Sequence, residues 1–350
     1  MFDFEYIGNL HIHSVHSDGS GKVSEIADLA AKVGLDFICI NDHAYMTDDL
    51  HLEEEGLYGK VLVFMGLEMG VRYNHYLAFN IRERVRQHNL SAQEMIDEVK
   101  RQGGFGFIAH PFEKGMPFRE KSVAYTWNDF SVNGYAGLCI WNFTSRWKER
   151  VRTPFHGLFF LAFKTQTLKG PSRKTLSFWD AECQKRKVAA VGGSDAHGSL
   201  FQWGPITVRP FSYEYLLNSI NVHILLNKKL SGDFQEAKKE VYRSLMEGRL
   251  FVAHDNLYPA KGFRFDFASN DGSYLFMGEE DSFSPGELVV ELPSEGEIRL
   301  IKDGKLLRKW RGLDAVFQVS EKGVYRVEVY RRLRVFGWRA WIFSNPIYLR

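Results

Sequence analysis

Hydrophobic and polar positions follow two alternating patterns along the first 255 residues or so. Short apolar runs end in glycine, proline or polar side chains, which is typical of buried parallel strands. Apolar residues at helical spacing occur between these runs. The runs that predict strands are Phe37–Ile40, Val61–Met65, Phe105–Ala109, Gly137–Trp141 and Val188–Val191. Alternation of strands and helices over this length predicts an α/β fold.

Two of the predicted helices carry recognisable ends. Val23, Ile26 and Ala30 recur at helical spacing, and Gly34 stands where a C-terminal glycine cap is expected. Ser91 and Glu94 form a capping-box pattern that opens a second helix, which we expect to end near Gly103. These helices would connect and cover the strands.

The last ninety or so residues predict strands instead. Leu288–Leu292 and Ile298–Ile301 are short apolar runs, and Asp303-Gly304 predicts a hairpin turn. Apolar and charged residues alternate over 325–329, and no helix is expected after about residue 290. We therefore expect an α/β domain over 1–255 and a small all-β, sandwich-like domain with its connecting segment over 256–350.

The composition is that of an ordinary globular protein, with 45% hydrophobic and 25% charged residues among 350 and a net charge of +2. This balance does not require nucleic acid or an anionic membrane as a partner. Residues 271–300 hold eight acids and one arginine, whereas 301–350 hold twelve basic and four acidic residues. We interpret these stretches as oppositely charged strand faces; an anion-contacting face is the alternative.

The cysteines and the apolar stretches indicate where in the cell the protein is expected. Cys39, Cys139 and Cys183 are widely spaced and form no CxxC pair, which argues against disulfides and a thiolate metal site. The N-terminus lacks the pattern of a signal peptide, and the apolar stretch at 157–163 is far too short to span a bilayer. We expect a cytoplasmic protein without membrane attachment.

Metal-binding or acid–base side chains follow each predicted strand. In barrels of alternating strands and helices, the site forms at the carboxyl ends of the strands. Residues far apart in sequence would therefore converge there. The candidates are His11, His13, Asp18, His43, Glu68, His75, His110, Asp195 and His197.

The residue types in this set predict a site with several metal ions. His11 and His13 are two apart on one strand and would point to the same side, which suits two ligands of one ion. Gly19 would allow a sharp turn after Asp18. Nine ligands exceed what one ion needs, so we expect two or three, with Glu68 as a bridge. Nitrogen and oxygen ligands without thiolate favour Mn, Fe or Zn.

Six separated motifs stand out along the chain. They are NLHIHSVHSDGS at 9–20, GLDFICINDH at 34–43, GLEMG at 66–70, NHYLAF at 74–79, IAHPF at 108–112 and GGSDAH at 192–197. In this order they resemble the PHP (polymerase and histidinol phosphatase) family of metal-dependent phosphoesterases. The resemblance extends over residues 1 to about 255, and the ending WIFSNPIYL at 341–349 is similar to the C-terminal β-domain of some members.

The resemblance implies a distorted (β/α)7 barrel and a division of the ligands among metals. His11, His13, Glu68 and Asp195 would bind the first ion, and Glu68 would reach another. Asp18 and His43 would bind the second, and His75, His110 and His197 would complete a third site. Some members carry histidine where Asp18 stands, which leaves two or three ions open, and His16 is an alternative ligand to Asp18.

The expected chemistry is phosphoester hydrolysis of a small phosphorylated metabolite or nucleotide, monoester or diester. Clustered divalent ions make a shared hydroxide available to attack phosphorus. Asp195, His197 and Glu68 are the expected catalytic residues, with Asp195 first a ligand and second a base. Candidate substrate contacts are Lys114, Arg119, Asn142 and Arg146.

Two other functions use the same residues. The same hydroxide chemistry could cleave C–N bonds, as in an amidohydrolase. The basic stretch at 301–350 leaves room for an exonuclease or a polymerase-associated module, although the small net charge argues against it.

Overall fold

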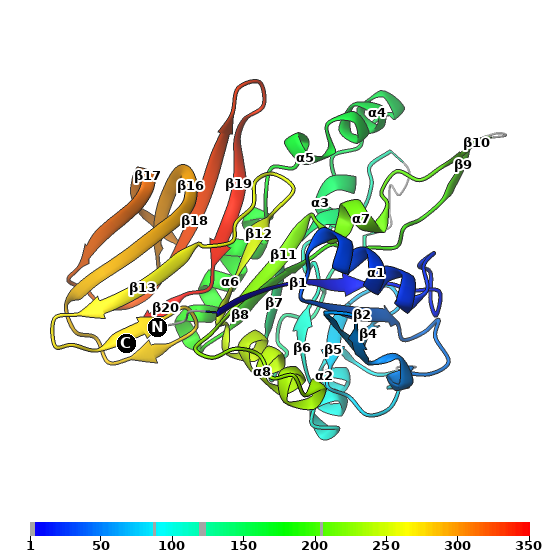
Figure 1. Cartoon of the computed structure of the whole chain (residues 1–350), viewed down its shortest axis with the longest axis horizontal. Helices are drawn as coiled ribbons and strands as arrows, with labels where there is room; N and C mark the ends of the chain where they lie inside the picture. Colours follow the sequence, from blue (N-terminus) through cyan, green and yellow to red (C-terminus); the bar gives the residue numbers. More distant parts are fainter. Residues whose placement is uncertain (1–3, 87–88, 119–123, 204–205) are drawn as a thin grey trace.

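The structure, a computed structural model, describes residues 4–86, 89–118, 124–203 and 206–350. It has a mixed α/β architecture built on a large sheet (Figure 1). The strands of the first 255 residues are β1 (Phe4–Ile12), β2 (Phe37–His43), β3 (Gly56–Tyr58), β4 (Val61–Met69), β5 (Tyr76–Phe79), β6 (Phe105–Ile108), β7 (Gly137–Asn142), β8 (Ala189–Gly193), β9 (Phe201–Trp203), β10 (Ile206–Val208), β11 (Ile220–Leu226) and β12 (Leu250–His254). All five apolar runs that predicted strands are therefore strands.

Helices occupy the connections between these strands. They are α1 (Val23–Val33), η1 (Leu52–Glu54), α2 (Ala92–Arg101), α3 (Phe143–Lys148), α4 (Pro154–Ala162), α5 (Lys164–Thr167), α6 (Arg173–Lys185), α7 (Tyr213–Leu217) and α8 (Phe234–Glu247). The predicted caps are confirmed: Gly34 ends α1 with a φ of 87°, and Ser91 accepts a hydrogen bond from the Glu94 backbone at the start of α2. Among the described residues, no helix is both long and apolar enough to cross a membrane.

The strand order differs from an all-parallel barrel. Pairing is parallel in β1–β2–β4 and again in β6–β7–β8, as expected, but β5 is antiparallel to both β4 and β6. Six residues join β4 to β5, and Gly70 turns the chain with a φ of 98°. Such a short link allows a hairpin but not the crossover that a parallel pair needs.

The two edges of this strand series meet at β8 and β1. Among the described residues no continuous ladder joins them, so the ring of ladders expected for a (β/α)7 barrel is not found. One parallel bridge pairs Ile12 with Ala196, and Ala196 accepts a hydrogen bond from the His13 backbone at 2.9 Å. The Ser194 backbone also donates to Leu10 at 3.2 Å. These contacts bring the ends of β1 and β8 together.

Helix α8 closes the opposite end of the strands. Tyr242 on this helix packs its ring 5.2 Å from that of Phe64 and 5.2 Å from that of Phe105. Both phenylalanines are buried in the large core of the α/β part. Aromatic side chains therefore fill one end of the strand series. The polar ends of β1, β2, β4 and β8 lie at its opposite end.

The C-terminal part consists of strands, as the sequence predicted. They are β13 (Arg264–Ser269), β14 (Tyr274–Phe276), β15 (Glu280–Asp281), β16 (Gly286–Lys302), β17 (Lys305–Val319), β18 (Gly323–Leu333), β19 (Gly337–Ser344) and β20 (Ile347–Leu349). The two short strands expected over 288–301 are one long strand, β16. Asp303 and Gly304 make the predicted turn to β17.

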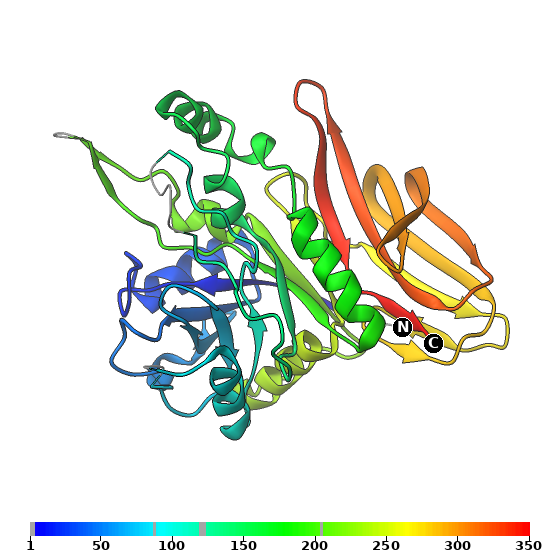
Figure 2. The same cartoon turned by 180° about the vertical axis from the view of Figure 1, so that it is seen from behind.

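This part has its own apolar core but shares the sheet. A second cluster of buried residues includes Val290, Ile298 and Val327. Strand β19 nevertheless pairs with β12, and α6 packs beside β18 through an ion pair from Arg326 to Asp180 (Figure 2). The division into 1–255 and 256–350 therefore stays a prediction.

Candidate metal centre

The nine predicted metal ligands lie at one end of the strands. His11, His43 and Glu68 lie in the last part of β1, β2 and β4, whereas Asp195 and His197 directly follow β8. All nine belong to four groups that share members. Within each group, the possible ligand atoms lie within 4.8 Å of one another. These groups are His13–Asp18–His43–His197, His11–His110–Asp195, His11–His13–Glu68 and His43–Glu68–His75. We call this set the histidine–carboxylate cluster.

Glu68 is at the centre of the cluster. Its Oε2 atom lies 3.0 Å from His11 Nε2, 3.4 Å from His13 Nε2 and 3.2 Å from His43 Nδ1. Its Oε1 atom lies 2.7 Å from His75 Nδ1 and 3.2 Å from His110 Nε2. The side chain is 1% exposed. One buried carboxylate thus faces five imidazoles, which is the position expected of a bridging ligand.

Asp195 lies on another side of the same imidazoles. Its Oδ1 atom is 3.5 Å from His11 Nε2 and 3.4 Å from His13 Nε2. Its Oδ2 atom accepts a hydrogen bond from the Asn142 amide at 3.2 Å. Asn142 therefore holds one carboxylate oxygen and leaves the other directed at the histidines.

Asp18 and His197 form the outer side of the cluster. His197 Nε2 lies 3.2 Å from Asp18 Oδ1, and its Nδ1 lies 3.0 Å from the Asp195 carbonyl oxygen. Asp18 is 37% exposed, whereas Glu68 is almost fully buried. The cluster is therefore open to solvent on the Asp18 side.

Several imidazole nitrogens of the cluster have no hydrogen-bond partner although they are buried. They are His11 Nε2, both ring nitrogens of His13, His43 Nδ1 and His75 Nε2. His11 Nε2 is only 3.0 Å from a Glu68 oxygen, yet the geometry is not that of a hydrogen bond. A buried polar atom without a partner costs about 1–3 kcal/mol. Nitrogens and oxygens that converge in this way fit ligation of cations.

The backbone is strained at three cluster residues. His11, His110 and Asp195 have φ values of 65°, 24° and 55°, a region that residues with side chains rarely adopt. Such strain costs on the order of 1–3 kcal/mol and is concentrated at functional sites. At His11 it coincides with a register irregularity in β1, so His11 and His13 meet through this local distortion and not through simple strand alternation.

The antiparallel strand β5 explains the position of His75. His75 precedes β5, and the hairpin returns it to the end of β4, where Met69 pairs with Tyr76. A ligand only seven residues after Glu68 can therefore reach the same carboxylate. His75 thus joins the cluster despite the short interval.

Burial and neighbouring charges move the pKa values of the imidazoles in opposite directions. Burial and the nearby His13 lower the pKa of His43 to about 3. Burial also opposes the charged form of His197, but the hydrogen bond to Asp18 and the charge of Asp195 raise its pKa to about 9. Burial dominates at His43, whereas neighbouring carboxylates dominate at His197.

The carboxylates of the cluster remain anionic. Burial alone would raise the pKa of Glu68, but the adjacent His11, His75 and His43 hold it well below its usual range. His11, His13 and His197 act in the same way on the pKa of Asp195. Anionic carboxylates beside imidazoles are the donor set that binds divalent transition metals.

Asp42 positions the segment that carries Asp18, a role that sequence reasoning did not assign. Its carboxylate accepts hydrogen bonds from the Ser14 backbone and hydroxyl, both at 2.7 Å, and from the Ser17 hydroxyl at 2.5 Å. Its place directly before His43 at a strand end was the available signal. Gly19 matters for close approach, since a Cβ there would lie 2.2 Å from the His13 carbonyl oxygen.

The proposed division of ligands among three metals needs correction. No group of described residues joins His197 with His75 and His110; His197 lies with Asp18, His13 and His43. His16, the alternative to Asp18, is in none of the four groups, because its Nε2 contacts Glu54 at 2.6 Å and its ring stacks on His51.

The four predicted substrate-contact residues differ in their position relative to the cluster. Arg119 lies outside the described residues. Lys114 is exposed, and no contact with the cluster is recorded for it among the described residues. Arg146 pairs with Glu149 and donates to the Gly170 carbonyl, so its guanidinium is engaged. Asn142 contacts Asp195 directly. Sequence reasoning missed another cation, Lys148, which lines a cavity together with Asp195 and His197 and pairs with Glu113 at 2.5 Å.

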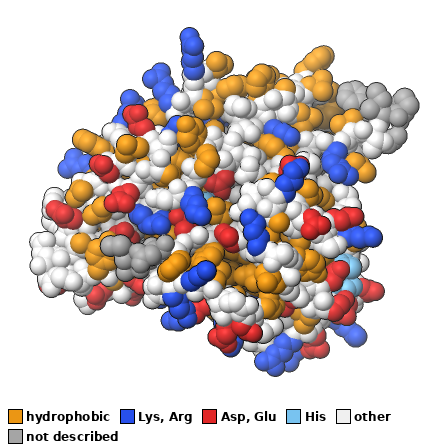
Figure 3. All heavy atoms as spheres, viewed as in Figure 1, with side chains coloured by type: hydrophobic (Ala, Val, Ile, Leu, Met, Phe, Trp, Pro, Cys, Tyr) orange, Lys and Arg blue, Asp and Glu red, His pale blue; other side chains and the backbone are white. Residues whose placement is uncertain are grey.

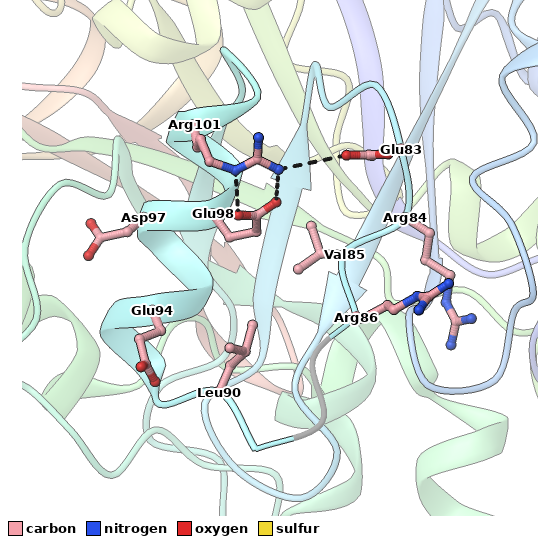
Figure 4. Close-up of a pocket in the computed structure, with 9 residues that line it drawn as sticks. All are labelled: Glu83, Arg84, Val85, Arg86, Leu90, Glu94, Asp97, Glu98 and Arg101. Atoms are coloured by element: carbon pink, nitrogen blue, oxygen red, sulfur yellow. Dashed lines mark hydrogen bonds and ion pairs between the residues drawn. The ribbon is translucent and has the colours of Figure 1, made fainter.

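Two cavities differ in their relation to the cluster. One of about 560 Å³ is lined by Asp195 and His197 together with apolar residues of α3 and α4. Another of about 780 Å³ lies against α2 and is lined by none of the predicted site residues. There Arg101 pairs with Glu98 and Glu83 across the hollow (Figure 4). The chemistry therefore belongs with the first cavity.

Residues 9–133 match the family model of the PHP domain. This range includes His11, His13, Asp18, His43, Glu68, His75 and His110 but not Asp195 and His197. The resemblance read from the motifs is thereby confirmed over that range. No curated protein matches the chain.

Solved structures similar to this chain have low sequence identity. A two-domain protein from Bacteroides vulgatus, containing a predicted PHP-like metal-dependent phosphoesterase, is 14% identical with a TM-score of 0.45, covering 97% of this chain and 95% of that one. A putative metal-dependent phosphoesterase from Bifidobacterium adolescentis is 16% identical with a TM-score of 0.33, covering 55% and 87%. An amidohydrolase from Chromobacterium violaceum is 15% identical with a TM-score of 0.30, covering 59% and 99%.

Proposed function

We propose that this chain, which matches the PHP domain over residues 9–133, is a metal-dependent phosphoesterase. Its substrate would be a small phosphorylated molecule, cleaved as a phosphatase or phosphodiesterase does. The proposal includes a PHP-type barrel for residues 1–255, a C-terminal β-domain for 256–350 and a cytoplasmic location.

One observation carries the proposal: both oxygens of the buried Glu68 face imidazoles, several of whose nitrogens have no hydrogen-bond partner. Without cations, a site of this kind would bury polar atoms at a cost and gain nothing in exchange. With cations, each of these histidines can offer one ring nitrogen as a ligand. The residues present therefore fit a metal site.

The donors suit two or three divalent transition-metal ions. They are imidazole nitrogens and carboxylate oxygens, a set that favours Mn, Fe or Zn. Cys39, Cys139 and Cys183 are buried and free, and none belongs to the four ligand groups. Overlap of the groups at Glu68 and His43 supports ions that share ligands.

Ions bound there would lower the pKa of a water molecule and neutralise phosphate oxygens. Glu68 would be one of the residues that hold these ions, together with the imidazoles around it. Asp195 is fixed by Asn142 at Oδ2 and so can orient a water or take up its proton at Oδ1. His197, whose Nδ1 hydrogen bonds to the Asp195 carbonyl, keeps Nε2 directed at Asp18 and the open side.

Phosphate contacts would come from groups at the open side. We prefer Lys148 to Arg146 as the cation, because both are ion-paired but only Lys148 lines the cavity that Asp195 and His197 also line. Lys114 and Arg119 remain proposals from the sequence. Asn142 acts on substrate through Asp195 in this proposal.

The alternative functions have less support. Hydrolysis of a C–N bond would need the same cluster, so a substrate test must separate it. For nucleic acid, the face in Figure 3 mixes Lys and Arg with Asp and Glu side chains and shows no broad basic area. Glu297 also pairs with Arg299 and Arg311, so part of the charge in the C-terminal region is internally balanced.

The test is a product assay on the metal-loaded protein. Phosphate release should be measured over alkyl, sugar and nucleoside phosphates and cyclic diesters, beside amine or ammonia release from amides. The proposal expects phosphate release that stops on chelation and returns with Mn, Fe or Zn. Amide cleavage without phosphate release would overturn it.

A further inference from the structure

The 560 Å³ cavity next to the cluster, here called the apolar cavity, has a pronounced chemical asymmetry. Asp195 and His197 lie at one part of its wall. Most of the remaining lining is apolar, including Met116, Trp147, Leu158, Leu161 and Phe211. Its volume is within the usual range of small-molecule sites, about 300–1,000 Å³.

The apolar wall is held in place by its own packing. The Trp147 indole nitrogen donates to the Phe160 carbonyl at 3.3 Å, and its ring packs edge-on against Phe211 with centroids 4.7 Å apart. Phe211 also packs edge-on against the buried Phe143 at 5.4 Å. The wall is therefore a preformed surface.

The polar groups in this wall are few and mostly engaged. The Thr144 hydroxyl lies 3.0 Å from the carbonyl oxygens of both Ser194 and Asp195. Lys148 pairs with Glu113. A sugar or a base placed here would leave many of its own polar atoms without partners, at about 1–3 kcal/mol each. An alkyl or aryl group would leave none.

We propose that the apolar cavity binds the alcohol part of the substrate, and that the substrate is a phosphoester of an apolar alcohol or phenol. The inference rests on the proposed phosphoesterase function and narrows it away from nucleotides and sugar phosphates. Water oxygen forms a bond to phosphorus, the bond from phosphorus to the alcohol oxygen breaks, and a proton from water ends on the released alcohol.

The test uses two matched series on the metal-loaded full chain. In a series of n-alkyl phosphates from ethyl to octyl, kcat/KM should rise roughly threefold per methylene until the cavity is full. Ribose 5-phosphate should be turned over at least about tenfold less efficiently than butyl phosphate, since its hydroxyls would lose hydrogen bonds. In a parallel series of alkylphosphonates, which cannot be hydrolysed at the P–C bond, affinity measured by calorimetry should rise with chain length.

Leu158→Gln is the diagnostic variant, because Leu158 lines the cavity yet is 53% exposed, so the fold should tolerate the change. It should make both series less steep, lowering kcat/KM for octyl phosphate about tenfold and leaving ethyl phosphate within about twofold. Leu313→Gln is the matched control, at a residue of β17 that is 56% exposed and outside the cavity. It should leave both series unchanged.

The outcomes separate the two proposals. Equal kcat/KM across the alkyl series, or a slope that Leu158→Gln leaves intact, would overturn the assignment of the cavity while phosphate release still supports the enzyme class. Length-dependent phosphonate binding without hydrolysis of any phosphate ester would support the cavity and overturn the enzyme class.

Discussion

Two buried networks of histidine and carboxylate side chains lie at opposite ends of β1. At the start of the strand, His223 Nδ1 lies 2.8 Å from Glu5 and its Nε2 lies 3.0 Å from Asp255. Glu5 also accepts from Arg264 at 2.8 Å, and Asp255 accepts from the Asn221 amide at 2.9 Å. Every ring nitrogen of this network has a hydrogen-bond partner.

At the other end of β1 the same residue types behave differently. His11 and His13 are as buried as His223, at 0% exposure. Yet His11 Nε2 and both nitrogens of His13 have no hydrogen-bond partner, although carboxylate oxygens lie within 3.0–3.5 Å of His11 Nε2 and His13 Nε2. Their possible ligand atoms nevertheless lie within 4.8 Å of one another in each group.

The two networks therefore have different roles. The His223 network satisfies its own charges and stabilises the contact of β1 with β11 and β12. The histidine–carboxylate cluster carries backbone strain and orphan nitrogens that only a further group can satisfy. The first should therefore respond to mutation in stability, and the second in metal content and activity.

Mutation of Glu68 should have the largest effect on activity and metal content. Glu68→Gln removes the charge that faces five imidazoles, so we expect turnover to fall about 1,000-fold or more, beside a loss of bound metal. Steady-state kinetics and elemental analysis of the purified variant measure both. Glu5→Gln is the matched control: it changes a buried glutamate of the other network and should keep both metal and turnover.

The second effect concerns His223. In His223→Gln two buried carboxylates lose a charged partner, which should lower the free energy of unfolding by about 3 kcal/mol. Denaturant unfolding gives this value, and metal content should stay as in the parent chain. His156→Gln, at an exposed histidine of α4, should change stability by less than about 0.5 kcal/mol. A loss of metal in His223→Gln would mean that the two networks are not separate.

The stability difference between the parent chain and His223→Gln should depend on pH. Burial opposes the charged form of His223, but Asp255 and Glu5 raise its pKa to about 9, above the roughly 6.5 of an unfolded histidine. Its contribution to stability is therefore complete below about pH 6.5 and is lost as pH rises towards 9. The difference in unfolding free energy between the parent and His223→Gln should shrink over that window. A difference that grows with pH would reverse the assigned sign.

The smallest expected effect is on Asp42, which acts through other residues. Asp42→Asn keeps an acceptor but removes the charge that holds Ser14 and Ser17, so the segment carrying Asp18 should loosen. We expect kcat/KM to fall about tenfold and metal affinity to weaken, with stability nearly unchanged. Excess metal should restore part of the activity; if it restores none, Asp42 has a role other than positioning.

Much of the cluster could be predicted because strand ends are readable in sequence. Apolar runs followed by His, Glu or Asp marked members of the cluster, and the common edge of the strands followed from the α/β pattern. The ring arrangement could not be predicted in full, since the antiparallel turn at β5 depends on a six-residue link. That same turn brings His75 to Glu68.

Other features could not be predicted from the sequence, because they depend on contacts between segments that are far apart along the chain. The grouping of His197 with Asp18 depends on how the segments after β1 and β8 approach each other. The apolar cavity draws its wall from α3, α4 and the stretch near Phe211, so no local pattern reveals it. Lys148 was missed for the same reason, because nothing in its neighbourhood in the sequence marks it as near Asp195.

Elemental analysis of the purified chain shows most simply whether the histidine–carboxylate cluster holds metal ions. The account predicts roughly two or three Mn, Fe or Zn ions per chain by elemental analysis, and fewer than one in Glu68→Gln, with His223→Gln at the parent value. A parent chain that releases phosphate at full rate while holding less than one ion would contradict it.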